Sequence, residues 1–153
     1  MALKIYYRDN DQFIEISQNG TMTSPLATIH DGKTGDVISS QLYLRNDDDT
    51  VWYSNIEVLP FDKNTGEINS GDVNYEDTGW GMKLSLGSIE PTETMWEDID
   101  WGESILFSRI GNSGSPDTAK YYPFWCLITC PPNHDAVTKE NLSLRVEYTE
   151  NAI

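Results

Sequence analysis

The chain has 153 residues, a length typical of one domain, and such a domain can bury roughly 70% of the surface that its unfolded chain exposes. Its 25 acidic and 10 basic side chains give a net charge of −15, which argues against DNA, RNA and anionic membranes as partners because like charges repel. No apolar run approaches the roughly 20 residues of a membrane helix, and the first residues lack the apolar stretch of a signal peptide. We therefore expect synthesis in a cytoplasm.

The first segment, residues 2–17, contains two short alternating runs separated by the turn-forming residues Asp9-Asn10-Asp11. We predict two strands that form an extra hairpin or an N-terminal arm within residues 1–25 of a single β-sandwich domain, 1–153. Residues 18–36 are rich in Gly, Thr, Ser and Pro. Within them, a short strand is predicted at Leu26, Ala27 and Ile29.

The most regular stretch runs from Val37 to Pro60 and alternates apolar and polar residues in two arms. Between the arms, residues 46–49 favour a turn over a strand. The pattern predicts a β-hairpin with one face in the core and the other outside. The predicted inner residues are Ile38, Leu42, Leu44, Ile56 and Val58, and the predicted outer residues are Gln41, Tyr43, Arg45, Asn55 and Glu57.

The middle of the chain begins with a polar loop, Phe61–Thr78, and loops of this length are usually functional or mobile. In Pro91–Trp101, the spacing of apolar residues allows one short helical turn. Between these segments, Trp80–Leu86 predicts a strand with Met82, Leu84 and Leu86 inward and Lys83 and Ser85 outward.

The last third predicts three strands, Ser104–Ile110, Tyr122–Cys130 and Asn141–Thr149, with a Gly/Ser/Pro loop at Gly111–Lys120. In the last strand, one face is expected to hold Leu142, Leu144, Val146 and Tyr148, and the other Ser143, Arg145 and Glu147. The chain therefore has eight or nine short strands and no long amphipathic helix. This pattern predicts an all-β protein, an antiparallel immunoglobulin-like β-sandwich, with a jelly roll as the alternative.

The two cysteines, Cys126 and Cys130, lie in an apolar strand. Four residues of extended chain span about 13 Å, well beyond the roughly 4.4 to 6.8 Å of a disulfide. The two histidines do not obviously complete a metal site. We predict core thiols, and no metal or cofactor.

Residues 111–116, GNSGSP, resemble the loop around the nucleophilic serine of chymotrypsin-like and glutamyl-endopeptidase-type proteases. That resemblance implies Ser113 as the nucleophile, His30 as the base and an intervening carboxylate. An ordinary turn is the simpler explanation, because Gly/Ser/Pro loops arise readily between strands. We therefore assign no catalytic residue and expect no enzyme.

Acidic clusters offer further candidate sites. Residues 46–49 and 9–11 could supply oxygens to calcium, but both lack the glycine and terminal glutamate of an EF-hand loop, so solvated turns are favoured. Trp80, Trp96 or Trp101 could stack on a sugar or anchor a protein interface. Carboxylates close to Trp96 and Trp101 in the sequence are typical of sugar-binding clefts, although an acidic composition alone also explains them. There are four: Glu97, Asp98, Asp100 and Glu103.

Three polar residues, Asn19, Asn141 and His134, are expected to carry no function. Asn19 and Asn141 match the glycosylation pattern, which is used only in a secretory route. His134 is interpreted as a loop residue.

Three short segments carry a family resemblance: Asp31-Gly32, Leu42-Tyr43-Leu44-Arg45-Asn46 and Tyr53-Ser54-Asn55-Ile56-Glu57-Val58. They resemble the immunoglobulin-like modules of tailed-bacteriophage virion proteins. The resemblance implies a capsid decoration or cement protein, or a neck or tail accessory, and it implies no site residue.

The expected function is thus a non-enzymatic virion structural protein, made in the host cytoplasm. Its expected partners are other virion proteins, above all the major capsid protein, with no nucleic acid and no membrane. Closed contacts would favour a homodimer or homotrimer. We expect three contact regions, namely Leu3–Arg8, Phe61–Thr78 and the Trp96–Trp101 surface. A carbohydrate-binding module is the alternative of another class.

Overall fold

A computed structural model describes residues 3–16, 28–30, 37–115, 120–131, 137–139 and 141–153. One sheet contains β1 (Leu3–Asp9), β2 (Gln12–Glu15), β4 (Val37–Asn46), β6 (Gly81–Leu86) and β8 (Tyr121–Thr129). A second sheet contains β5 (Val51–Asp62), β7 (Ile105–Ile110) and β10 (Leu142–Ala152). A separate pair joins β3 (Thr28–His30) to β9 (Val137–Lys139). The helical turns are η1 (Gly71–Val73), α1 (Tyr75–Thr78) and α2 (Glu93–Glu97).

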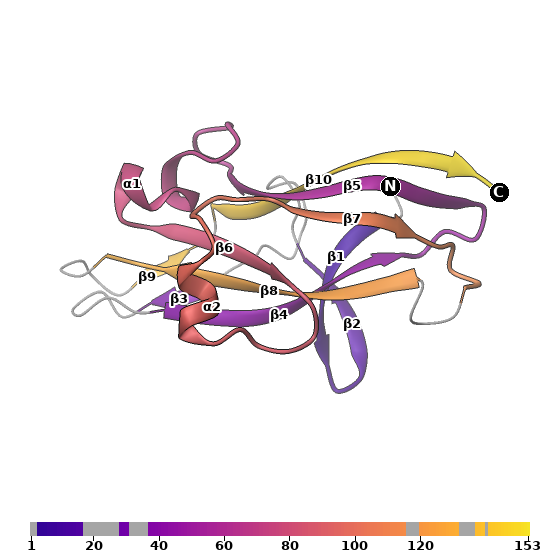
Figure 1. Cartoon of the computed structure of the whole chain (residues 1–153), viewed down its shortest axis with the longest axis horizontal. Helices are drawn as coiled ribbons and strands as arrows, with labels where there is room; N and C mark the ends of the chain where they lie inside the picture. The colour runs from indigo at the N-terminus through magenta and orange to yellow at the C-terminus, as the bar shows by residue number, and fades with distance from the viewer. Residues whose placement is uncertain (1–2, 17–27, 31–36, 116–119, 132–136, 140) are drawn as a thin grey trace.

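The two larger sheets form the layers of a sandwich (Figure 1). The strand order is β2-β1-β4-β8-β6 in the five-stranded sheet and β10-β5-β7 in the three-stranded sheet, and the pairings are antiparallel. The predicted all-β antiparallel sandwich is therefore confirmed. The inner faces of both layers meet in one buried cluster that includes Leu42, Leu44, Ile56, Val58, Phe107, Phe124 and Leu144.

The prediction of a hairpin at Val37–Pro60 was wrong in its pairing. Both arms are strands, but β4 pairs with β1 and β8, whereas β5 pairs with β10 and β7. The chain crosses from one sheet to the other at residues 47–50, which makes a β-arch. Alternation cannot distinguish an arch from a hairpin, because both bury the same faces of the two strands.

Individual positions in the strands also differ from expectation. Leu86 is 52% exposed rather than inward, since β6 ends there and the chain turns at Gly87. Asn55 has φ of 50° at a bulge between β5 and β10, so that Tyr53 and Ile56 both face the core despite their odd spacing.

The segment Phe61–Thr78 is partly structured rather than a plain polar loop. Asp62, 2% exposed, accepts hydrogen bonds from the backbone N–H groups of Asn64 at 2.9 Å and Asp72 at 2.8 Å, and from Asn141 Nδ2 at 2.7 Å. The same amide of Asn141 also donates to Asp72 at 2.9 Å. A buried asparagine used in this way has no room for a glycan. Asn19, the other glycosylation motif, lies outside the described residues.

The two cysteines are buried, as predicted, and they do not form a disulfide with each other. Cys126 belongs to the core cluster of the sandwich. Burial raises the pKa of its thiol to about 12, so the sulfur is a packing atom rather than a thiolate.

Candidate binding surface on the five-stranded sheet

The outer face of the five-stranded sheet carries an unusual set of large side chains. Because side chains alternate along β4, Tyr43 and Arg45 point away from the core formed by Leu42 and Leu44. The cross-strand partners of these two residues lie on the same face. Together they define an aromatic–arginine patch made of Tyr6, Arg8, Phe13, Tyr43, Arg45 and Tyr121.

Phe13 of β2 is the centre of this patch. Its ring centroid lies 5.4 Å from that of Tyr43, 5.2 Å from that of Tyr121 and 6.0 Å from that of Tyr6. The contacts with Tyr43 and Tyr6 are edge-to-face, the geometry in which aromatic quadrupoles attract. The rings therefore hold one another in place.

Two guanidinium groups cover the same phenylalanine. The Cζ of Arg45 lies 4.4 Å from the Phe13 centroid, and that of Arg8 lies 4.8 Å from it. Such cation–π contacts attract because the face of an aromatic ring carries negative charge density. The arginines are thus positioned by rings, which leaves donors of both side chains available at the surface.

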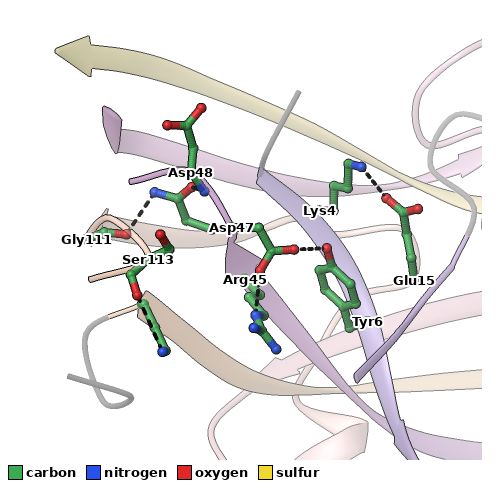
Figure 2. Close-up of polar contacts among 10 residues, drawn as sticks. Lys4, Tyr6, Glu15, Arg45, Asp47, Asp48, Gly111 and Ser113 are labelled. Carbon is green, nitrogen blue, oxygen red and sulfur yellow. Dashed lines mark hydrogen bonds and ion pairs between the residues drawn. The ribbon is translucent and has the colours of Figure 1, made fainter. Parts of the chain in front are cut away.

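Polar contacts fix the edge of the patch, as Figure 2 shows. The Tyr6 hydroxyl donates to Asp47, and Arg45 Nε pairs with the other carboxylate oxygen of Asp47 at 2.6 Å. Lys4 and Glu15 form an ion pair at 2.8 Å between β1 and β2. Burial and then the bond to Asp47 raise the pKa of Tyr6 above its ordinary value, so this hydroxyl keeps its proton.

The acidic turn at residues 46–49 is occupied by internal contacts. Asp48 accepts from the backbone N–H of Thr50 at 2.7 Å and from its hydroxyl at 2.6 Å, and these bonds lower the pKa of Asp48. Asp47 is bound by two residues of the patch, Tyr6 and Arg45. Across the described part of the chain, no group of three His, Cys, Asp or Glu side chains could hold a metal ion.

A groove lies on the same outer face, towards β6. It has a volume of about 620 Å³, and its floor is formed by outward residues of β4, β6 and β8 such as Ser39, Lys83 and Leu127. These three residues are in register across the strands. Its walls come from α1 and from the segment 90–101, and they contribute Tyr75, Glu90, Pro91, Glu93, Trp96, Glu97 and Trp101. We call this feature the Lys83 groove.

Lys83 points outward, as predicted, but it is only 8% exposed because Trp101 and α2 cover it. Its Nζ donates to the carbonyl of Trp96 at 2.8 Å and lies 4.4 Å from the Trp101 ring centroid. Burial lowers the pKa of Lys83, while the nearby carboxylates of Asp100 and Glu97 oppose this shift. The groove therefore has a cation in its floor and carboxylates at its rim.

An aromatic pair forms one wall of the groove. Tyr75, the first residue of α1, stacks on Trp101 with centroids 5.3 Å apart and planes 20° apart. The indole also rests against Gly81, where an added Cβ would overlap the ring of Trp101. Tyr75 is 48% exposed, so part of its side chain remains open to solvent.

The protease resemblance implies Ser113 and His30 as a pair, but the elements that carry them lie at opposite ends of the sandwich: β3 at one end and the segment after β7 at the other (Figure 1). β3, which ends with His30, contacts β4, and Figure 1 places it where β4 begins. The N–H of Ser113 donates to the carbonyl of Asp48, just beyond the last residue of β4. A ten-residue strand is about 30 Å long. The two residues cannot meet as base and nucleophile in this arrangement.

The three expected contact regions contribute to these two features to different degrees. Leu3–Arg8 supplies two outward residues of the patch, Tyr6 and Arg8. Phe61–Thr78 supplies only Tyr75 to the groove, whereas the 96–101 segment supplies three of its lining residues. Trp80 is 9% exposed and does not line the groove. His134 and Asp31-Gly32 lie outside the described residues.

Several residues of the surface were not singled out from the sequence. Phe13 falls in a short predicted run to which no role is assigned, although the alternation of QFIEIS marks Phe13 and Glu15 as one face. Tyr121 lies between the predicted loop Gly111–Lys120 and the predicted strand Tyr122–Cys130. Tyr75 lies in a polar segment with no periodicity, so no sequence signal indicates its stacking on Trp101.

No helix in the described part of the chain is long and apolar enough to cross a membrane. No protein-family model matches the chain, and a search of curated proteins found no relative.

Proposed function

We propose that the chain is a non-enzymatic structural protein of a virion, a capsid decoration or cement protein that stabilises a phage shell. A neck or tail accessory is the alternative within the same class. The observation that carries this proposal is the aromatic–arginine patch on the outer face of the five-stranded sheet. Tyrosine and arginine are enriched at the energetic centres of protein interfaces, which favours a protein as the ligand of this patch.

The patch is suited to docking because its side chains are already ordered. Binding normally costs about 0.5–1.5 kcal/mol for each flexible side chain that it immobilises. In this patch, Phe13 holds three rings and two guanidiniums before any partner arrives. Most of the ordering cost is therefore met during folding.

The charge of the chain supports a structural role in two ways. A net charge of −15 opposes self-association in solution and contact with packaged nucleic acid. The patch, in contrast, concentrates Arg8 and Arg45 on one face. A partner with carboxylates or carbonyls at its surface, such as another virion protein, would complement it.

The decisive experiment counts this chain in purified particles from the source of the sequence by quantitative mass spectrometry. Hundreds of copies per particle would support a decoration or cement protein. A handful, in multiples of three or six, would support a neck or tail position. Absence from the particles would refute the virion proposal.

A second experiment tests the patch itself. Purified chain is added to particles that lack it, and the bound fraction is measured by co-sedimentation. Phe13→Ala should weaken docking by about tenfold or more, since it removes the ring on which both arginines rest. Leu106→Ala, at a residue 64% exposed on the three-stranded sheet, is the matched control and should dock normally. Equal docking of the two variants would exclude the patch.

A second function, carbohydrate binding, is favoured by one specific observation, the stacked Tyr75–Trp101 pair beside Lys83. It would use the groove rather than the patch, and the two functions are compatible.

A further inference from the structure

The Lys83 groove combines donors, acceptors and an aromatic surface within one small volume. At about 620 Å³ it falls within the range of about 300–1,000 Å³ typical of small-molecule sites. Most of its polar side chains come from the rim, where Glu93 and Glu97 of α2 are exposed. Glu90 is held in place by the hydroxyl of Ser39, which donates to it at 2.6 Å.

The ammonium group of Lys83 has hydrogen-bonding capacity to spare. It is more than nine-tenths buried, and one of its N–H donors bonds the carbonyl of Trp96. Its remaining donors have no hydrogen-bond partner among the described residues. A buried donor without an acceptor costs about 1–3 kcal/mol, so a ligand oxygen at this point would be favoured.

The charges in the groove select against ions of either sign. A cationic ligand would place its charge beside the buried ammonium of Lys83 in a region of low dielectric. An anionic ligand would have to pass the carboxylates of Glu90, Glu93 and Glu97. A neutral ligand with hydroxyl groups avoids both penalties, because each hydroxyl can accept from the ammonium and donate to a carboxylate.

The aromatic wall adds a flat apolar surface whose position is fixed in advance. Tyr75 is half-exposed and is backed by Trp101, which in turn rests on Gly81. The C–H face of a sugar ring is the part of a polyhydroxylated ligand that can cover such a ring and remove it from water.

We propose that the Lys83 groove is a binding site for a neutral saccharide, which packs a ring face on Tyr75 and directs hydroxyl groups to Lys83 and to the carboxylates at the rim. The site is independent of the aromatic–arginine patch. A variant that disables the groove should therefore leave docking to particles unchanged, so failure of one proposal can be told from failure of the other.

The test titrates the full chain, labelled with ¹⁵N, with maltotriose, cellotriose and chitotriose up to about 10 mM, which detects millimolar binding. We expect at least one trisaccharide to shift the indole N–H resonance of Trp101 and the backbone resonances of α2. Trp52 is an internal control, because it lies on the other sheet under Arg109, with the guanidinium 4.2 Å from its ring centroid. Its indole resonance should not move.

Two pairs of variants assign the roles. Tyr75→Ala should weaken binding about tenfold, whereas Tyr75→Phe, which keeps the ring, should bind within about twofold of the unchanged chain. Lys83→Met keeps the apolar stem and removes the donors, and it should weaken binding by a similar factor. Glu97→Gln, at an exposed position on α2, tests the rim without placing the fold at risk. The matched control is Tyr148→Ala, at a tyrosine 36% exposed on β10.

Three results would overturn the proposal. The first is that none of the three trisaccharides moves a groove resonance. The second is that the shifts persist unchanged in Tyr75→Ala and Glu97→Gln. Alternatively, trilysine shifts these resonances while the sugars do not, which would make the groove a site for cationic peptides instead.

Discussion

Asn46 is the residue at which β4 ends and the chain crosses to the other sheet, and its removal should be costly. The side chain is fully buried. Its Nδ2 donates to the carbonyls of Val51 at 3.0 Å and Gly111 at 2.8 Å, and its Oδ1 accepts from the N–H of Asp48 at 2.9 Å. Asn46→Ala removes all three bonds. At about 1 kcal/mol for each, the free energy of unfolding should fall by about 3 kcal/mol.

Urea unfolding followed by tryptophan fluorescence measures this loss directly. For a chain of this size, about 3 kcal/mol corresponds to a decrease in Tm of about 9 °C. The exposed Asn64→Ala is the control, and its free energy of unfolding should stay within about 0.5 kcal/mol of the unchanged chain. A loss below about 1 kcal/mol in Asn46→Ala would refute the view that this amide holds the arch together.

Asn46→Asp tests the same site through pH. The introduced carboxyl group would face two carbonyls in a buried position, which raises its pKa in the folded chain above the ordinary value of about 3.9. A group of this kind stabilises the fold fully below its unfolded pKa and loses that contribution as the pH rises. Asn46→Asp should therefore be more destabilised, relative to the unchanged chain, at about pH 7 than at about pH 3. Equal destabilisation at both pH values would show that the site is open to water, and the opposite order would show that the fold stabilises the carboxylate.

Three further predictions follow from packing and burial. Gly81→Ala should displace the indole of Trp101 and destabilise the chain by about 1–3 kcal/mol. It should also weaken the near-ultraviolet circular dichroism of the stacked Tyr75–Trp101 pair. The control is Gly114→Ala, where the added methyl group has only one close neighbour, and it should leave stability and circular dichroism unchanged. Tyr53 should titrate late in absorbance, because burial and then Glu150 raise its pKa to about 12. Its contribution to stability is complete below the ordinary pKa of about 10 and is lost as the pH rises towards 12, so urea midpoints should fall in that interval and not below it. The thiol of Cys126, with its pKa raised to about 12 by burial, should resist an aromatic disulfide reagent at about pH 8 and react at once in denaturant, and fast reaction in the native chain would contradict its burial.

Alternation of apolar and polar residues was sufficient to predict most strands and the sandwich class. The prediction was strongest where the pattern was regular: Leu42 and Leu44 in β4, and Leu142, Leu144 and Val146 in β10, are buried. Tyr148, on the same predicted face of β10, is 36% exposed, because it lies at the bulge where the register of β10 shifts. The helical turn in Pro91–Trp101 also exists, as α2, and Thr92 is its N-cap. Local spacing carries this information because one face of each element meets the core.

Strand pairing and the surroundings of outward residues could not be predicted in the same way. Lys83 has the outward position that its strand assigns, but Trp101, far along the chain, determines that it is buried. Asp62 and Asn141 are polar residues at strand ends in the sequence, yet they form a buried contact between segments 79 residues apart. Such contacts depend on which distant segments the fold brings together, and the local sequence pattern does not encode this pairing.

The arch at Asn46 also determines what the outer face can bind. In a β4–β5 hairpin, the outward neighbours of Tyr43 and Arg45 would come from β5, a strand whose outward residues include Ser54 and Glu57. Because the chain crosses to the other sheet instead, both edges of β4 are open to β1 and β8. Those strands bring Tyr6 and Tyr121 beside Tyr43 and Arg45, and β2 adds Phe13 above them. The patch is thus assembled from the β1–β2 hairpin, β4 and β8, which come from three separate parts of the chain. A change that converted the arch into a hairpin would abolish the patch without altering any of its residues.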